Sequence, residues 1–462
     1  MRAMMFMTLL SVAASCGSIS QRAPVKGKSI KLITLDPGHF HAALVQKTMY
    51  PGVDSAVQVY APAGADVQLH LERIKGYNSR AESPTAWKEE VYAGPDFMQR
   101  MLQEKKGNVV VMSGNNGKKT DYILQALGAG YHVLADKPMA IDKANFATLQ
   151  TAFATAEKNN VLLYDIMTER YEISTMLQRE FSFLPAVFGE LEKGTAENPA
   201  VTKESVHHFF KYVSGNILTR PPWFMDVAQE GEGIVDVTTH LVDLVQWECF
   251  PGKTLDYQKD IELVSARRWA TPISLSQFNA ITKGNGFPAY LLKDVSNDTT
   301  LKVFSNGEIN YKLRGIHAKV AVTWAYKAPE GTGDTHYSIM RGSKAALVIR
   351  QGAEQGFKPS LYIEPKGGPT EIYAAALQAG LTKIQAAFPG IDVKKTAAGW
   401  EVLIPEKYRE SHETHFARVT EKFLEYLKAG ALPSWEVPNM IAKYYTTTRA
   451  LEMALQNGTA AK

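Results

Sequence analysis

The chain has 462 residues, of which 45% are hydrophobic and 21% are charged, values typical of a globular enzyme. Its 51 basic and 47 acidic residues leave a formal net charge of +4. So small a charge on so long a chain, with no basic block, excludes a nucleic-acid-binding surface and strong electrostatic steering of a substrate. The length predicts two or three domains.

Residues 1–16 have the pattern of a signal peptide of the lipoprotein type. Arg2 supplies a positive charge, and the mostly apolar run that follows it is too short to span a bilayer. The segment that ends at Cys16 is similar to a bacterial lipobox without its usual leucine, so we expect a lipidated Cys16 and export to the periplasm or membrane surface. Residues 17–29 would be a polar tether and the lipid the only membrane contact. An ordinary secretory peptide and an uncleaved apolar segment are the alternatives.

The only other cysteine is Cys249, which lies in an apolar helical run and is expected to pack in the core. Two cysteines exclude a Cys-based zinc site. An internal disulfide is also excluded if Cys16 is lipidated.

Residues 30–166 alternate short apolar strands with helices. This alternation indicates βαβ units and a parallel sheet, and the Val, Ile and Leu content is that of strands covered on both faces. We therefore predict an α/β domain with a doubly wound, Rossmann-type sheet. Its strands are predicted at 31–35, 56–60, 108–112, 132–135 and 161–165, and its helices at 41–50, 66–77, 96–105, 119–128 and 143–159.

Residues 167–462 are predicted to form an α+β domain for substrate binding and oligomerisation. Longer strands with turn residues between them indicate a large, mostly antiparallel sheet. Extended stretches are predicted at 187–195, 261–269, 301–304, 318–326, 336–341 and 345–350, and helices at 172–183, 412–429 and 437–456.

The turn after the first strand is a candidate phosphate site. A strand, a tight turn with glycine and a helix form an anion site, because free backbone N–H groups and the helix dipole point at the ligand. Three glycines are usual in this turn, but only Gly38 is present, with Ala42 and Ala43 where the helix must approach the sheet. We expect Gly38, His39 and Phe40 to contact a dinucleotide.

Four residues after the strand 108–112 are further cofactor candidates, because ligands bind at the carboxyl edge of open α/β sheets. A turn whose asparagines cap the next helix is the alternative interpretation. The second strand does not end in an acid that would hold the adenosine ribose, and the nearest acid is Asp66, so NAD and NADP both stay open. The four residues are Ser113, Gly114, Asn115 and Asn116.

Two motifs carry candidate catalytic groups. Lys137 ends the fourth strand between Asp136 and Pro138, where a fixed lysine would reach the nicotinamide end of a dinucleotide; an ordinary solvated lysine is the alternative. Asp236 and His240 lie four residues apart, so a helix places them on one stripe, together with Asp243 and Trp247. An amphipathic helix with a capping aspartate is the alternative there.

These motifs together resemble the Gfo/Idh/MocA family, which includes glucose–fructose oxidoreductase and inositol dehydrogenase. Residues 130–138 are similar to the family's strand end G-x-x-V-x-x-E-K-P, with Asp136 in place of the glutamate. Residues 233–243 are similar to its Asp–His helix, and the lead-in to that helix includes Trp223. Residues 114–116 replace its T-P-N loop, and Lys119 stands near the place of the histidine that usually follows. The resemblance covers about residues 30–350.

The resemblance implies an oxidoreductase that transfers hydride between tightly bound NAD or NADP and a hydroxyl group of a sugar or glycoside. It implies that His240 accepts the hydroxyl proton, since the ordinary pKa of histidine, about 6.5, lies near neutral pH. It further implies that Lys137 stabilises the alkoxide and Asp236 orients the substrate or His240. A homodimer is implied by the same family. The candidate sugar contacts are Lys211, Trp223, His208, Asp236 and His240.

Three other functions are open. His39 and His41 form a His-x-His at a strand end, an arrangement of metal ligands in amidohydrolase-type barrels, which would indicate an exported metal-dependent hydrolase. Later strand ends offer Asn115, Asn116 and Lys137 rather than further ligands, so we expect no metal. A redox-neutral glycosidase of the same fold, which recycles its nicotinamide, suits export. A non-catalytic sugar-binding lipoprotein is the third.

Overall fold

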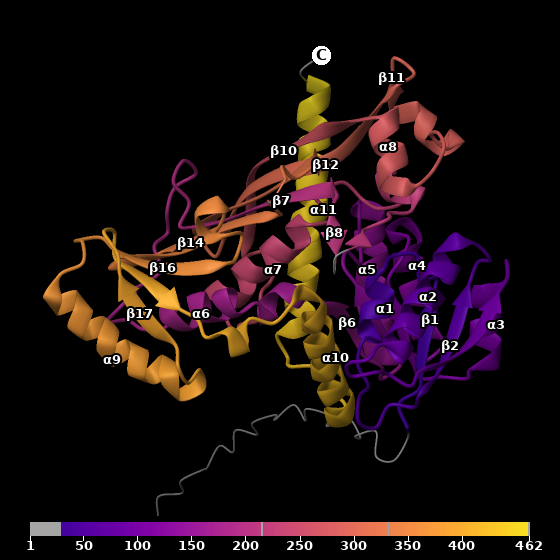
Figure 1. Cartoon of the computed structure of the whole chain (residues 1–462), viewed down its shortest axis with the longest axis horizontal. Helices are drawn as coiled ribbons and strands as arrows, with labels where there is room; N and C mark the ends of the chain where they lie inside the picture. The colour runs from indigo at the N-terminus through magenta and orange to yellow at the C-terminus, as the bar shows by residue number, and fades with distance from the viewer. Residues whose placement is uncertain (1–28, 214–215, 331, 461–462) are drawn as a thin grey trace, which may run out of the picture.

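Two β-sheets and the helices that cover them make up the structure, a computed structural model that describes residues 29–213, 216–330 and 332–460 (Figure 1). The predicted signal peptide and Cys16 lie outside these residues. Within them, no helix is both long enough and apolar enough to cross a membrane.

The first sheet has six parallel strands in the order β3-β2-β1-β4-β5-β6, the arrangement that binds dinucleotides in Rossmann domains. The strand order reverses between β1 and β4. The chain segments that leave the carboxyl ends of these two strands therefore run in opposite directions along the sheet. The strands are β1 (Leu32–Leu35), β2 (Ala56–Ala61), β3 (Lys88–Ala93), β4 (Val109–Met112), β5 (His132–Asp136) and β6 (Leu163–Ile166), and the helices are α1 (His41–Val45), α2 (Ala65–Ser79), α3 (Phe97–Glu104), α4 (Asn116–Gly128) and α5 (Lys143–Lys158).

The edge strand β3 was not predicted from the sequence. It contains Lys88, Glu89 and Glu90, and most of its side chains are exposed or half-buried. Charges of this kind protect a sheet edge from pairing with other chains, and they hide the apolar pattern that identifies a strand. The buried strands β1, β4, β5 and β6 follow the prediction to within two residues at each end.

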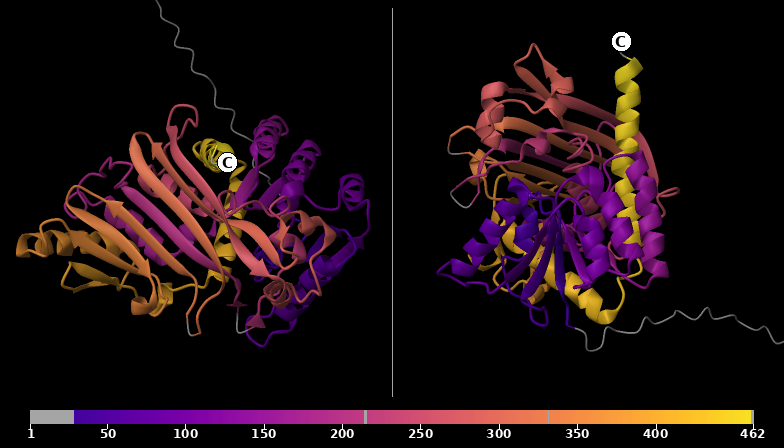
Figure 2. Two further views of the ribbon diagram at one scale, coloured as in Figure 1. Left: turned by 90° about the horizontal axis from the view of Figure 1, so that it is seen from above. Right: turned by 90° about the vertical axis from the view of Figure 1, so that its right-hand side faces the viewer.

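The second sheet is mixed and mostly antiparallel, with ten strands (Figure 2). Its order is β10-β12-β13-β7-β14-β15-β16-β18-β17, with β11 beside β12, and only β13 and β7 pair in parallel. The predicted fold class is confirmed. The strands are β7 (Val201–Phe210), β10 (Ile261–Ser274), β11 (Val295–Ser296), β12 (Thr300–Leu313), β13 (Ile316–Lys327), β14 (Thr335–Arg341), β15 (Ala345–Gln351), β16 (Ser360–Pro365), β17 (Asp392–Lys395) and β18 (Trp400–Leu403), and β8 (Tyr212–Val213) pairs with β9 (Asn216–Ile217) outside the sheet.

Two predictions in this domain were wrong. The central strand β7 was missed because Lys203 interrupts its apolar pattern; its ammonium is fully buried and donates to both carboxylate oxygens of Glu248 at 2.8 and 2.9 Å. The stretch 187–195 is not a strand but forms isolated bridges, because the chain turns at Gly189 and Gly194, both at positive φ. The helices of the domain are α6 (Ile173–Ser182), α7 (Thr238–Cys249), α8 (Leu275–Thr282) and α9 (Glu371–Ala387).

The two C-terminal helices, α10 (His412–Ala429) and α11 (Glu436–Ala460), return to the first domain (Figure 1). Phe416 and Phe423 of α10 belong to the core of the first sheet, and the Phe423 ring stacks on Tyr164 of β6. Helix α11 contacts α5 of the first domain and both α7 and β10 of the second. These helices therefore join the two domains through a shared core.

A buried ionic network fixes α7 at this junction. Arg170, just after β6, donates two hydrogen bonds of 2.7 Å to Asp243 on α7 and contacts Glu436 on α11 at 3.0 Å. Lys443 on α11 contacts Asp165 of β6 at 2.6 Å and Asp243 at 2.9 Å. Because these charges are fully desolvated, each depends on its partners, and the network ties α7 to the end of the first sheet.

We predict that Lys443→Met destabilises the fold by about 3 kcal/mol, because it leaves the buried Asp165 without its cation and Asp243 with Arg170 alone. The matched control is Lys422→Met on α10, which removes an exposed ion pair with Glu425 and should cost less than about 1 kcal/mol. Chemical denaturation of both variants measures the difference. Equal losses would contradict the role assigned to the network.

Candidate active site

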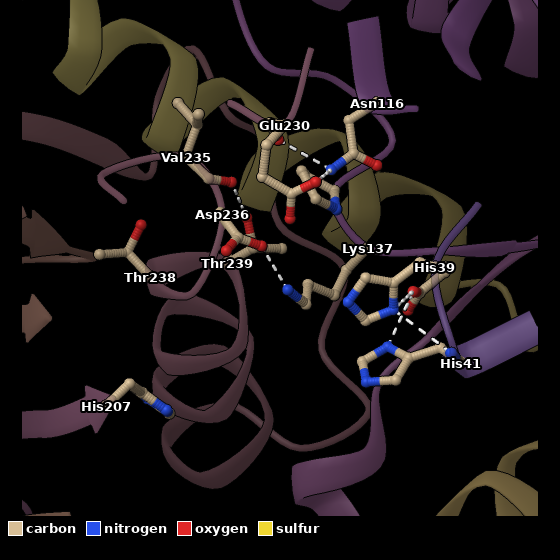
Figure 3. A network of polar contacts seen from close by, with 12 residues as sticks. His39, His41, Asn116, Lys137, His207, Glu230, Val235, Asp236, Thr238 and Thr239 are labelled. Atoms are coloured by element: carbon tan, nitrogen blue, oxygen red, sulfur yellow. Dashed lines mark hydrogen bonds and ion pairs between the residues drawn. The ribbon is translucent and has the colours of Figure 1, made fainter. Parts of the chain in front are cut away.

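Most of the predicted site residues lie along one edge, where β1, β4 and β5 end (Figure 3). A segment of the second domain, residues 223–236, runs against this edge. We call it the covering segment. The predicted residues that it contacts have their hydrogen-bonding groups occupied and cannot bind a ligand unless it moves.

At the β5 end of the edge, Lys137 forms an ion pair with Asp236. The two side chains are only 11% and 7% exposed, so the pair lies almost out of water. Burial lowers the pKa of Lys137, but Asp236 and neighbouring carboxylates outweigh it and raise that pKa above its ordinary value. Burial, and then Asp236, raise the pKa of the adjacent Glu230 well above its ordinary range. A protonated lysine thus stands at the predicted reactive end.

His240 lies in the first turn of α7, four residues after Asp236. Burial, and then the charge of Lys137, lower the pKa of His240 to about 3, so its imidazole is neutral at pH 7. Its Nδ1 is buried and has no hydrogen-bond partner among the described residues. The ring is neutral, as a proton acceptor must be, but with this pKa it is a weaker base than the ordinary histidine value expected from the sequence.

His240 also lines a cavity of about 1020 Å³ between α7, β7, β14 and the start of α10. This volume suffices for a sugar or glycoside. The walls are rich in imidazoles, since six of the chain's eleven histidines line them, which favours a ligand with many hydrogen-bonding groups. These histidines are His207, His208, His240, His336, His412 and His415.

On the cavity wall opposite α7, the carboxylate of Asp334 lies close to three basic side chains. Asp334 accepts from His208 Nδ1 at 2.8 Å and from Lys211 Nζ at 2.9 Å, and lies 3.4 Å from His207 Nδ1. Although burial opposes it, His207 and Lys211 hold the pKa of Asp334 well below its ordinary range. The predicted sugar contacts His208 and Lys211 are therefore on the cavity, whereas Asp334 and His207 were missed because no motif marks them.

The predicted phosphate turn offers few free donors. The N–H of Gly38 donates to Asp36 at 2.8 Å, and the N–H of His39 donates to Ser113 at 3.1 Å. Helix α1 has only five residues, and His41, which is buried, occupies the place of the third glycine of the usual fingerprint. The prediction that Gly38 and His39 hold a pyrophosphate finds little support in this turn.

Trp223 of the covering segment lies directly on Gly38. A Cβ atom added to Gly38 would be 2.9 Å from the indole and 3.1 Å from Asp66 Oδ2. The indole Nε1 donates to Asp66 Oδ2 at 2.8 Å. The bare face of the glycine, which in dinucleotide sites approaches the pyrophosphate, therefore approaches Trp223 instead. Trp223 does not line the large cavity, so its predicted contact with a sugar stays a prediction.

The covering segment also occupies the residues after β4. Asn115 Nδ2 donates to Gln229 Oε1 at 2.7 Å, Asn116 Nδ2 donates to the Glu230 carbonyl at 2.8 Å, and the N–H of Gly117 donates to the Gln229 carbonyl at 2.9 Å. At the start of α4, these two side-chain amides and the N–H of Gly117 therefore already have hydrogen-bond partners in the covering segment. This arrangement does not fit an extended dinucleotide, which would require the covering segment to move.

Lys119 was not predicted as a site residue, yet its side chain holds the loop after β5 in place. Its ammonium is buried, and it donates to the carbonyl oxygens of Asp136 at 2.9 Å and Pro138 at 3.4 Å and to Asn116. Burial lowers the pKa of Lys119 to about 8. Gly114 lets the backbone after β4 approach the backbone after β1, since a Cβ atom at Gly114 would be 2.1 Å from the Asp36 carbonyl oxygen.

His39, His41 and Asp136 meet at the same edge, although we expected no metal ligands there. His41 Nδ1 is 2.9 Å from Asp136 Oδ2, and His39 Nδ1 is 3.9 Å from the same oxygen. Phe40, between the two histidines, faces the cavity. The barrel considered for the hydrolase alternative does not form, because the first sheet is open, with β3 and β6 at its edges.

Comparisons with known proteins agree with this fold. The family described as "Putative oxidoreductase C terminal domain" matches residues 177–455, and "Oxidoreductase family, NAD-binding Rossmann fold" matches residues 58–165. A crystal structure of a "putative oxidoreductase" from Parabacteroides merdae is 59% identical, with a TM-score of 0.91 over 93% of this chain and 98% of that one. The chain belongs to the Gfo/Idh/MocA family of oxidoreductases. The resemblance drawn from the sequence is confirmed.

More distant members of this fold were solved with nucleotides. A 3-ketoreductase from Actinomadura kijaniata with TDP-benzene and NADP is 14% identical, with a TM-score of 0.52 over 92% of this chain and 98% of that one. A biliverdin reductase from Synechocystis with biliverdin and NADP+ is 11% identical, with a TM-score of 0.55 over 92% and 99%. No curated protein matches. The Rossmann-family match begins at residue 58, after the first strand and the altered turn.

We predict that Trp223→Ala increases the affinity for NAD or NADP by roughly tenfold, the effect of about 1.4 kcal/mol, because the indole no longer competes for Gly38. Isothermal titration calorimetry of the purified chain measures the affinity. Trp247→Ala, a half-buried tryptophan on α7 away from the edge, is the control and should change little. Weaker binding by Trp223→Ala would show that the indole belongs to the nucleotide site.

Proposed function

We propose that this chain is an oxidoreductase that acts on a hydroxyl or keto group of a sugar or glycoside held in the large cavity. The observation that carries the proposal is the place of His240 on the cavity wall, just after Asp236, which is paired with Lys137. His240 lines the cavity directly, and Asp236 stands four residues before it, where Lys137 from the end of β5 reaches it across the two domains.

The cavity wall supports a polyhydroxylated substrate. Histidine and lysine side chains supply donors, and Asp334 and Glu169 supply acceptors, so a ring with several hydroxyl groups would find partners on both sides. Phe40 and Phe210 add apolar surface for the faces of such a ring. A purely apolar substrate would leave these polar groups unpaired, which is costly.

The chain's own residues handle the proton of the reacting hydroxyl. The imidazole of His240 on the cavity wall accepts it, and the Lys137 ammonium, held protonated by Asp236, stabilises the alkoxide that forms. Asp236 positions the lysine rather than taking the proton, because its carboxylate is already engaged in the ion pair. In the reverse direction the same groups return a proton to a keto oxygen.

The redox partner that we propose is NAD or NADP, in keeping with the family's Rossmann fold and with the NADP in the distant 3-ketoreductase. The Trp223 end of the covering segment must leave Gly38 for this partner to bind, while Asp236 at its other end stays paired with Lys137.

We predict that Lys137→Ala and His240→Ala each lower kcat by about 10² to 10⁴-fold, because each removes a group that moves or stabilises the hydroxyl proton. Formation of a keto-sugar from simple glycosides, followed by mass spectrometry, measures turnover. His317→Ala alters a half-buried histidine outside the cavity wall and is the matched control.

Nucleotide released on denaturing the purified chain identifies the partner. Retained NAD or NADP, with turnover lost in both variants, is the expected result. Unchanged turnover in both variants, or a chain that neither carries nor binds either nucleotide, would contradict the proposed function.

A further inference from the structure

We propose that His39, His41 and Asp136 form a binding site for one divalent transition-metal ion such as Zn²⁺, in the turn that usually holds a pyrophosphate (Figure 3). This inference goes beyond the proposed function and does not rest on it. Its basis is a set of three ligand-type side chains that the fold brings together from residues almost a hundred positions apart.

The spacing of the three groups suits a metal ion. Their ligand atoms all lie within 4.8 Å of one another. Metal–ligand bonds of about 2.1 Å at tetrahedral or octahedral angles place neighbouring ligand atoms roughly 3.0 to 3.4 Å apart. Asp136 Oδ2 lies 2.9 Å from His41 Nδ1 and 3.9 Å from His39 Nδ1, values on either side of that spacing. Small side-chain rotations therefore complete the coordination geometry.

The protonation of the three groups also suits a metal ion, which binds neutral imidazole and ionised carboxylate. The Nδ1 of His39 accepts a long hydrogen bond of 3.3 Å from the N–H of His41, so this nitrogen carries a lone pair. His41 Nδ1 lies 2.9 Å from Asp136 Oδ2, at hydrogen-bond distance from a carboxylate oxygen. On binding, the proton that His41 shares with Asp136 moves to Nε2 of the same ring.

Neighbouring side chains hold the ligands in place. Ser113 Oγ donates to Asp136 Oδ2 at 2.8 Å, which orients the carboxylate. The His39 ring stacks on Phe224 at 6.1 Å between ring centroids, and the His41 ring packs on Phe416 at 4.6 Å. Such partners, together with an apolar shell, are the usual surroundings of metal ligands in proteins.

The local charge permits a cation. Lys137, the nearest ammonium on the same strand end, is already neutralised by Asp236, and Lys119 donates to backbone carbonyls rather than to the Asp136 carboxylate. The cluster lies beside the cavity, because Phe40 and His412 line the cavity and their rings also pack near the His41 ring. Two histidines and one carboxylate leave open coordination positions for an oxygen ligand.

The alternative is a closed hydrogen-bonded cluster in which His41 donates to Asp136 and no ion binds. The two possibilities differ in a direct measurement. The full chain is stripped with a chelator and titrated with Zn²⁺ by calorimetry, and with Co²⁺ while the visible absorption that reports low-symmetry nitrogen and oxygen coordination is recorded. We expect saturation at one equivalent and a Co²⁺ spectrum that excess Zn²⁺ abolishes.

Variants then locate the ion. His41→Gln and Asp136→Asn should weaken Zn²⁺ binding by about 100-fold or more, and Ser113→Ala by about tenfold. His317→Gln, outside the cluster, should bind as the parent chain does. Circular dichroism checks that each variant folds, and His39→Gln, whose side chain is partly exposed, decides the matter if the buried variants do not fold.

Three results would overturn the proposal: no stoichiometric binding of Zn²⁺ or Co²⁺, binding that survives in His39→Gln and His41→Gln, or binding that His208→Gln abolishes while His41→Gln does not. The last would place the ion at Asp334 on the cavity wall. None of these results depends on nucleotide binding or turnover, so failure of this proposal is distinct from failure of the proposed function.

Discussion

The contact between the Trp223 indole and the bare face of Gly38 decides what the rest of this structure can bind. In a Rossmann domain that glycine lets the backbone approach a pyrophosphate. Here the indole takes the place of the phosphates and its Nε1 holds Asp66, at the start of α2. In this conformation the phosphate end of the first sheet's edge is therefore closed by the chain itself, and His240 beyond it lines the large cavity.

The closure is a consequence of how firmly α7 is held. Arg170 and Lys443 tie Asp243 to the end of the first sheet, so the residues just before α7 have little freedom and lie along that edge. The Lys137–Asp236 pair joins the end of β5 in the first domain to the covering segment of the second. The chain thus keeps the family's Lys137 at the end of β5 and the Asp236 that pairs with it. At the turn after β1, His39, His41 and Trp223 occupy the place where a pyrophosphate usually binds.

The sequence predicted those parts that follow from local pattern. The buried strands, the final helices, and the motifs around Lys137 and His240 are read from periodicity and spacing, which short-range packing enforces. The edge strand β3 and the central strand β7 escaped because Glu89, Glu90 and the buried Lys203 break the apolar pattern. The contact of Asp136 with His39 and His41 was not predicted, because it depends on the order of the strands β1, β4 and β5 in the sheet, which no local pattern in the sequence specifies.

The most direct measurement is a crystal structure of the full chain grown with NAD or NADP. The account predicts that any dinucleotide bound at residues 36–41 has displaced the Trp223 indole from Gly38, and that where the indole stays the edge is empty of nucleotide. A pyrophosphate bound at this turn, with Trp223 still touching both Gly38 and Asp66, would contradict it.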